Sequence, residues 1–141
     1  MKSVQFIEQP PAMPELPEVE TTRRGLLPHV AGRRVDHVLL RRPDLRWPIP
    51  REVEDLLPDR RIDGIRRRAK YLLLDTEAGS ALLHLGMSGS LRVLPGDTPV
   101  RAHDHVDIVL DSGRVLRFND PRRFGCLLWQ APGEIHPLLA G

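Results

Sequence analysis

Residues 61–94, RIDGIRRRAKYLLLDTEAGSALLHLGMSGSLRVL, hold the pattern that decides the fold. Two segments rich in β-branched and other apolar residues, 61–75 and 80–94, stand on either side of a glycine-bearing break at 77–79. Short breaks of this kind between strand-forming segments are typical of antiparallel hairpins. The middle of the chain is therefore predicted to be an antiparallel sheet.

The segments around this stretch extend the sheet. Downstream, 105–110 and 114–129 repeat the strand pattern on either side of the turn 111–113, which predicts a run of antiparallel hairpins. Upstream, 34–41 alternates around apolar residues and is predicted to be a further strand.

Two helices are expected as well. Residues 17–27 begin with acidic side chains and continue into arginines, the charge order that a helix dipole favours, and 51–57 fits a short helix between prolines. Helices combined with antiparallel strands predict the α+β class, as an antiparallel β-sandwich flanked by α-helices. After the loop at 132–133 we expect no closing element, as in a truncated chain.

The length of 141 residues suits one domain. We expect 1–12, which is aperiodic and ends in prolines, to be a disordered extension, and 13–141 to be the folded domain. A composition of 40% apolar and 28% charged residues excludes the disordered and membrane classes. With no leader or membrane segment in the sequence, we expect a cytoplasmic, nucleoid-associated bacterial protein.

The basic residues favour a nucleic-acid partner. All but two of the 21 are arginine, which binds phosphate with two parallel hydrogen bonds; the alternative is a solvated charged face. Cys126 is the only cysteine, so a disulfide and a four-cysteine zinc site are both excluded. We expect no metal and no cofactor in this chain, and a monomer.

Met13-Pro14 is the most informative dipeptide, because removal of an initiator methionine there would leave a proline with a free secondary amine. An α-amino group is roughly two hundred times more often unprotonated at neutral pH than a lysine. Such an amine condenses with an aldehyde to give a cationic iminium, an electron sink for elimination. Glu15 and Glu18 stand nearby and could move protons, although acidic residues at a helix start usually serve only the dipole.

Three further stretches could contact DNA. The run 66–70 ends in Lys70 and places positive charge at a sheet edge, for phosphate binding or as protection of an edge strand. In 84–90 two glycines flank Met87, which is either core filling, the more common role, or a wedge. His103 and His105 could suggest a metal, but without further ligands a phosphate contact is the better interpretation.

The loop 119–125 combines Arg122, Arg123 and Phe124 between a proline and a glycine. A protein that acts on a base inside a duplex must extrude it and fill the gap with arginine and apolar side chains. Met87 and Phe124 could be such wedges, with Arg122 in the vacated space.

Four segments in order, 14–20, 67–74, 84–90 and 120–125, resemble the formamidopyrimidine-DNA glycosylase family. The resemblance covers 13–141 and is to the formamidopyrimidine branch more than to the endonuclease VIII branch. It implies a base-excision repair enzyme, a bifunctional glycosylase and abasic-site lyase that removes 8-oxoguanine and formamidopyrimidines from double-stranded DNA.

The same resemblance assigns roles to single residues. It implies that Pro14 forms the Schiff base, that Glu15 donates the proton for base removal, and that Lys70 contacts phosphate and assists β-elimination, with Glu18 as a supporting acid. The residues that it implies as DNA contacts or as fillers of the gap are His103, Arg122, Arg123, Met87 and Phe124.

Members of the family also have a second half with a helix-two-turn-helix and a zinc finger, which this chain lacks. In addition, the extension 1–12 would keep the nitrogen of Pro14 inside an amide, and so blocked, while it remains attached. Two alternatives therefore stay open: a catalytically silent DNA-binding fragment, and a basic β-domain whose arginines only solubilise it.

Overall fold

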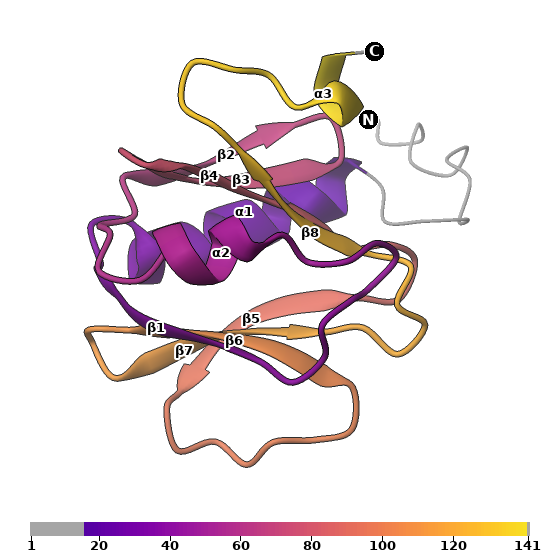
Figure 1. Cartoon of the computed structure of the whole chain (residues 1–141). Helices are drawn as coiled ribbons and strands as arrows, with labels where there is room; N and C mark the ends of the chain where they lie inside the picture. Colours follow the sequence, from indigo (N-terminus) through magenta and orange to yellow (C-terminus); the bar gives the residue numbers. More distant parts are fainter. Residues whose placement is uncertain (1–15, 141) are drawn as a thin grey trace, which may run out of the picture.

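The computed structural model describes residues 16–140, which form two antiparallel sheets packed face to face (Figure 1). The elements along the chain are α1 (Leu16–Val30), β1 (Val35–Leu40), α2 (Arg51–Leu56), β2 (Gly64–Arg68), β3 (Tyr71–Thr76), β4 (Gly79–His84), β5 (Ser90–Pro95), β6 (Asp104–Leu110), β7 (Arg114–Asn119), β8 (Cys126–Gln130) and α3 (Pro137–Ala140). The expectations for 1–12, Pro14 and Glu15 lie outside the described residues.

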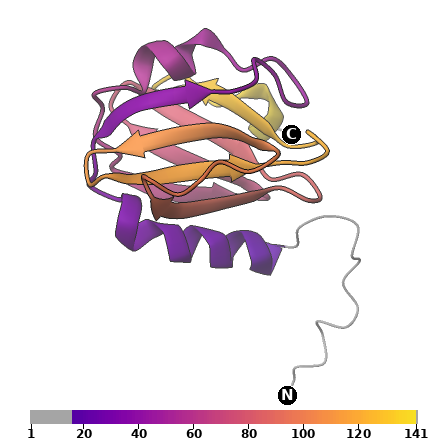
Figure 2. The same ribbon diagram turned by 90° about the horizontal axis from the view of Figure 1, so that it is seen from below.

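The architecture is the predicted α+β sandwich. The first sheet has the strand order β1-β6-β7-β5 and the second β2-β3-β4-β8. Helices close the two open sides: α1 packs against the edge strands β2 and β5, and α2 against the edge strands β1 and β8. Figure 2 shows α1 along one of these sides. Unpaired strand edges invite pairing with other chains, and the helices cover them.

The core lies between the sheets because side chains alternate along each strand. Leu72 and Leu74 of β3 are buried in the same cluster as Phe118 of β7. Leu73, between them, points to the outer face and packs in a second cluster with Leu139 of α3. The expectation that no element follows the loop at 132–133 is therefore wrong: α3 covers apolar side chains on the outside of the second sheet.

The connections differ from a simple run of hairpins. β2–β3, β3–β4 and β6–β7 are hairpins, but β4 and β5 belong to different sheets, as do β7 and β8. The expected segments 80–94 and 114–129 therefore each cross the sandwich, since both of their strands bury a face in the shared core. The first helix also continues past its expected end at 27 to Val30, which is fully buried. None of the helices within 16–140 is long and apolar enough to cross a membrane.

Candidate nucleic-acid interface

One end of the sandwich collects the segments that carry most of the predicted site residues. The strand register places two rows of residues there: Tyr71, His84 and Cys126 across the second sheet, and Ser90, Asn119 and Asp104 across the first. From this end the chain passes between the sheets at 85–89 and again at 120–125 (Figure 1). We call it the crossing end. The hairpin turns at 77–78 and 111–113 lie at the opposite end.

The two crossing segments touch through glycines. Gly86 has φ +66°, and a Cβ added there would lie 2.8 Å from the backbone nitrogen of Gly125. A Cβ on Gly125 would lie 2.4 Å from the carbonyl oxygen of His84. Both distances are shorter than van der Waals contact allows, so only glycine lets the backbones approach this closely.

Met87 and Phe124 are displayed by these apposed segments. Their exposed fractions are 48% and 47%, a high value for large apolar side chains. Core filling, the more common role for such a methionine, is therefore wrong for Met87. Two neighbouring loops instead present one apolar side chain each at the same end of the molecule.

Asp120 holds the second of these loops in shape. Its carboxylate is fully buried and accepts hydrogen bonds from the backbone nitrogens of Arg123 (3.1 Å) and Gly125 (2.9 Å). Arg123 has φ +56°, a strained conformation that these bonds stabilise. Sequence reasoning missed Asp120 as a site residue, although an aspartate directly before a proline is a turn signal.

His103 lies in a turn joined to the same aspartate. The backbone nitrogen of Asp120 donates to the carbonyl oxygen of His103 at 3.1 Å. His103 is exposed with φ +71°, whereas His105 is buried, with its Nε2 3.0 Å from the carbonyl oxygen of Asp120. Among the described residues no group of three or more His, Cys, Asp or Glu side chains could hold a metal.

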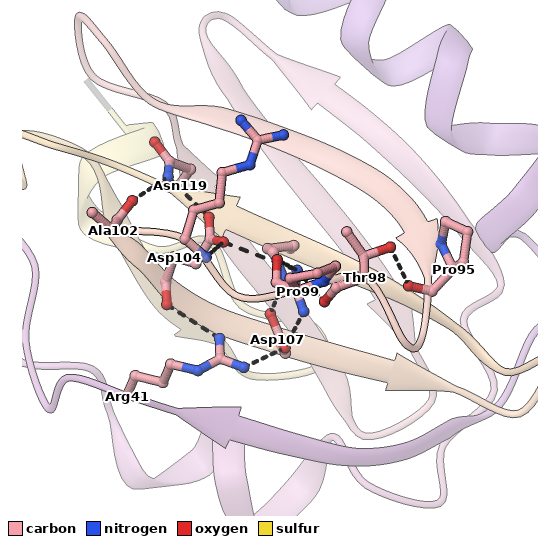
Figure 3. A network of polar contacts seen from close by, with 10 residues as sticks. Arg41, Pro95, Thr98, Pro99, Ala102, Asp104, Asp107 and Asn119 are labelled. Carbon is pink, nitrogen blue, oxygen red and sulfur yellow. Dashed lines mark hydrogen bonds and ion pairs between the residues drawn. The ribbon is translucent and has the colours of Figure 1, made fainter.

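A buried polar network anchors the loop 96–103 that leads to His103 (Figure 3). Arg117 binds Asp107 through Nε (2.9 Å) and Nη2 (3.1 Å), and its Nη1 donates to the carbonyl oxygen of Thr98 (3.1 Å). Arg41 donates to the Asp107 carboxylate at 2.7 Å. Asn119 donates to the carboxylate of Asp104 at 2.9 Å.

This network affects the ionisation of its carboxylates. Burial works against the charged forms, but hydrogen bonds and neighbouring arginines outweigh it and hold the pKa values of Asp104 and Asp107 below their usual range. Both stay charged at neutral pH, which fixes the turn before β6.

Lys70 and His84 lie close together at the crossing end. Burial, then the charges of Lys70 and Arg46, lower the pKa of His84, so its ring is neutral at pH 7. His84 Nδ1 accepts a hydrogen bond from the nitrogen of Gly86 at 3.0 Å, which leaves Nε2 as the protonated donor. His84 is a second residue that sequence reasoning did not assign to the site.

The arginine run before Lys70 has a mixed role. β2, which carries these arginines, is an edge strand. This agrees with the interpretation that their charges protect an edge strand from pairing with other chains. Arg66 pairs with Asp75 at 2.9 Å, and Arg67 with Glu20 at 3.0 Å. Hydrogen bonds from arginines, that of Arg23 first, hold the pKa of Glu20 well below its usual range. These arginines serve ion pairs within the domain, so the run is not simply a phosphate site.

The structure thus brings the predicted residues Lys70, Met87, His103, Arg122, Arg123 and Phe124 to the crossing end. Glu18 lies in the first turn of α1, whose N-terminal end is at the same end of the sandwich (Figure 1). Exposed apolar side chains, a neutral histidine donor and cations together suit a polyanion that carries flat apolar groups.

Comparison with known proteins gives consistent matches. The family model of the formamidopyrimidine-DNA glycosylase N-terminal domain matches residues 13–127. Formamidopyrimidine-DNA glycosylase of Stenotrophomonas maltophilia (strain K279a) is 80% identical over 129 residues, which are 92% of this chain and 48% of that protein. Its counterpart in Xanthomonas campestris pv. campestris (strain B100) is 74% identical over 91% of this chain. The chain spans about half the length of these curated relatives.

Solved structures agree with the fold. The Lactococcus lactis formamidopyrimidine-DNA glycosylase bound non-covalently to DNA containing an abasic site has a TM-score of 0.76 and 30% identity over 83% of this chain and 45% of that one. A complex of the same protein with tetrahydrofuran-containing DNA and an inhibitor has a TM-score of 0.81 and 30% identity, over 89% of this chain and 47% of that one.

Proposed function

Since the chain belongs to the formamidopyrimidine-DNA glycosylase family, we propose that it contributes the nucleophile and the base-stack wedge to an enzyme that excises oxidised purines from double-stranded DNA. The observation that carries this proposal is the exposed pair Met87 and Phe124, on two loops whose backbones lie in close contact beside Arg122. The substrates would be 8-oxoguanine and formamidopyrimidines, which the resemblance implies.

The wedge would act by filling the gap that a flipped nucleotide leaves. Removing a base from the stack costs a few kcal/mol, which apolar side chains inserted into the stack offset in part. The loop must hold its shape against the duplex, and the hydrogen bonds that the backbone nitrogens of Arg123 and Gly125 donate to Asp120 supply this stiffness. Met87 and Phe124 would enter the stack, and Arg122 would take the space of the extruded base.

Phosphates would be held around this wedge. Lys70 and Arg122 supply charge, and His103 and His84 supply imidazole donors at the same end of the sandwich. Arg123, whose guanidinium lies 3.9 Å from Asp44, would support the loop and also offer positive charge to phosphate. The positive charge of Lys70 disfavours protonation of His84. A phosphate bound between the two side chains would offset this effect.

The proposed chemistry depends on Pro14 and Glu15, which precede α1. With residues 1–13 removed, the Pro14 amine would form a bond to the sugar carbon C1′ as the bond from C1′ to the damaged base breaks, and opening of the sugar ring would then give the iminium. At a site that has already lost its base, the amine would add to the sugar aldehyde and water would leave. Lys70 would assist removal of the adjacent proton, and the electron pair would break the bond to the 3′ phosphate. Glu15 would protonate the departing base or sugar oxygen, with Glu18 in support.

We place the catalytic domain at 13–141 and 1–12 before it as an extension. As the resemblance implies, a zinc finger and a helix-two-turn-helix would belong to a second half of the relatives, and we expect the protein to be a cytoplasmic, nucleoid-associated monomer. The alternative is a silent DNA-binding fragment. It is favoured by the thirteen residues that precede Pro14, because a nitrogen inside an amide has no lone pair for attack.

The test is borohydride trapping of the chain, as expressed, on a duplex with 8-oxoguanine opposite cytosine. A covalent adduct mapped to Pro14 is the expected result for the enzyme, and Lys70→Ala should lower its yield. Preferential binding of the damaged duplex without an adduct would favour the silent fragment. Equal, weak binding of damaged and intact duplex, unchanged by Lys70→Ala and Arg122→Ala, would contradict both and leave the basic scaffold.

A further inference from the structure

A third segment leaves the crossing end and borders the loop 119–125, which carries Arg122, Arg123 and Phe124 and which we call the wedge loop. It follows β1, covers residues 41–50 and leads to α2. Between this segment and the wedge loop lies an open groove of about 420 Å³. The residues that line it are Leu45, Arg46, Trp47, Arg122, Arg123 and Phe124. We call it the Trp47 groove.

The two walls of the Trp47 groove are fixed relative to each other. The backbone nitrogen of Arg46 donates to the carbonyl oxygen of Gly125 at 3.1 Å, and the nitrogen of Leu45 donates to the carbonyl oxygen of Trp47 at 3.0 Å. Leu45 is only 5% exposed and anchors the segment in the core. The backbone that carries Trp47 is therefore held at a set position beside the loop that carries Phe124.

The chemistry of the walls suits a flat, anionic ligand. Trp47 is 38% exposed, a large area for the biggest aromatic side chain, and the guanidinium of Arg46 lies 5.0 Å from the centre of its ring. Arg122 and Arg123 add two more cations, and none of the six lining residues is acidic. Asp44, just outside, faces Arg123 at 3.9 Å and Arg42 at 3.1 Å.

We propose that the Trp47 groove binds an unstacked nucleobase of a DNA strand, with the base against Trp47 and the strand's phosphates on Arg122 and Arg123. An indole and a guanidinium both stack on base faces without regard to sequence, and arginines bind phosphate. This inference rests on the proposed function, because a strand that is part of a duplex would reach the groove only when Phe124 enters the duplex beside it; a single strand has unstacked bases and can enter the groove directly. It adds a base-binding site next to the wedge.

The Trp47→Leu variant tests the site by affinity. Stacking of one base on an aromatic side chain corresponds to roughly five- to 150-fold in affinity, so Trp47→Leu should weaken binding of a short thymidine oligomer about tenfold. Trp47→Phe keeps an aromatic face and should recover most of that loss. Ile135→Ala is the matched control, since it removes an apolar side chain that is 57% exposed in a different part of the surface.

A spectroscopic test separates stacking from charge. The chain has two tryptophans, so Trp129→Phe leaves Trp47 as the only indole reporter. A thymidine oligomer of about ten nucleotides should quench its fluorescence, whereas an oligomer of the same length built from reduced abasic sugar phosphates, which carry neither a base nor an aldehyde, should bind weakly and quench little.

Equal quenching by both oligomers, or unchanged affinity in Trp47→Leu, would overturn the base site. If damaged duplex still bound preferentially in that case, the proposed function would stand. If no oligonucleotide bound at all, both the groove and the proposed function would fail.

Discussion

Arg117→Met should destabilise the domain by about 3 kcal/mol, because Arg117 is the centre of the buried network that anchors the loop before His103. Its side chain is 3% exposed, and it makes two hydrogen bonds to Asp107 and others to carbonyl oxygens of that loop. Removing one partner of a buried ion pair costs about 3–5 kcal/mol, since the other charge stays buried. We expect a loss of stability at the lower end of this range because Arg41 still binds Asp107 at 2.7 Å.

Urea unfolding followed by circular dichroism at pH 7 measures the effect, and an unchanged m-value would show that the unfolded state is unaltered. The informative control is the double variant Arg117→Met with Asp107→Leu, which removes the orphaned charge together with its partner. A buried pair replaced by apolar side chains is often neutral in stability. We therefore expect the double variant to be at least about 1 kcal/mol more stable than Arg117→Met alone.

Two results would refute this reasoning. A loss below about 1 kcal/mol for Arg117→Met would mean that the pair is solvated and contributes as little as a surface ion pair. A double variant less stable than the single one would mean that Asp107 stabilises the fold through Arg41 alone. In that case the network would not act as one unit.

Further predictions concern acid stability, the thiol, the wedge and its support. Folding lowers the pKa values of Asp104 and Asp107, so these carboxylates stabilise the domain above pH ~4, and their contribution is lost as the pH falls through the lowered values. The midpoint of urea unfolding should therefore drop below pH 4. It should drop less in the Asp107→Asn variant. Burial raises the pKa of Cys126 to about 11, so a thiol reagent at pH 8 should react only after unfolding, and native labelling would contradict the packing. Asp120→Asn places an amide NH2 group against a backbone N–H donor, so it should lower the free energy of unfolding in urea by about 1–3 kcal/mol and weaken duplex binding measured by fluorescence anisotropy. If both values were unchanged, Asp120 would not support the loop. Phe124→Ala should reduce the preference for damaged over intact duplex more than it reduces overall affinity, and equal losses on the two duplexes would argue against intercalation.

Local patterns predicted most of the elements but not all of their connections. The turn at 111–113 and the strands around it follow from residue types that act within a few positions. Whether the strands on either side of 85–89 pair with each other is a different matter, because a hairpin and a sheet crossing both need apolar strands and a glycine-bearing turn. The choice depends on where the rest of the core lies, which a local pattern does not contain.

The candidate site likewise combines residues that a local pattern identifies with residues that only the fold brings together. Motifs marked Met87, Lys70 and the wedge loop as chemistry-bearing, but their surroundings came only from the fold. Asp120 acts through two backbone nitrogens brought to it by the loop, and His84 owes its neutral ring first to burial and then to cations contributed by other segments. Neither effect can be read along the chain, because the partners become neighbours only once the sheets have packed.

The separation of the crossing end from the hairpin turns at the opposite end has a practical side. The exposed loop tips of a domain accept insertions and attached groups with little effect on its folding. The turns at 77–78 and 111–113 could therefore carry an affinity tag, a fluorophore or a surface tether. A molecule immobilised in this way would face solution with its candidate DNA-binding end free, so that binding kinetics could be recorded without blocking the surface under study.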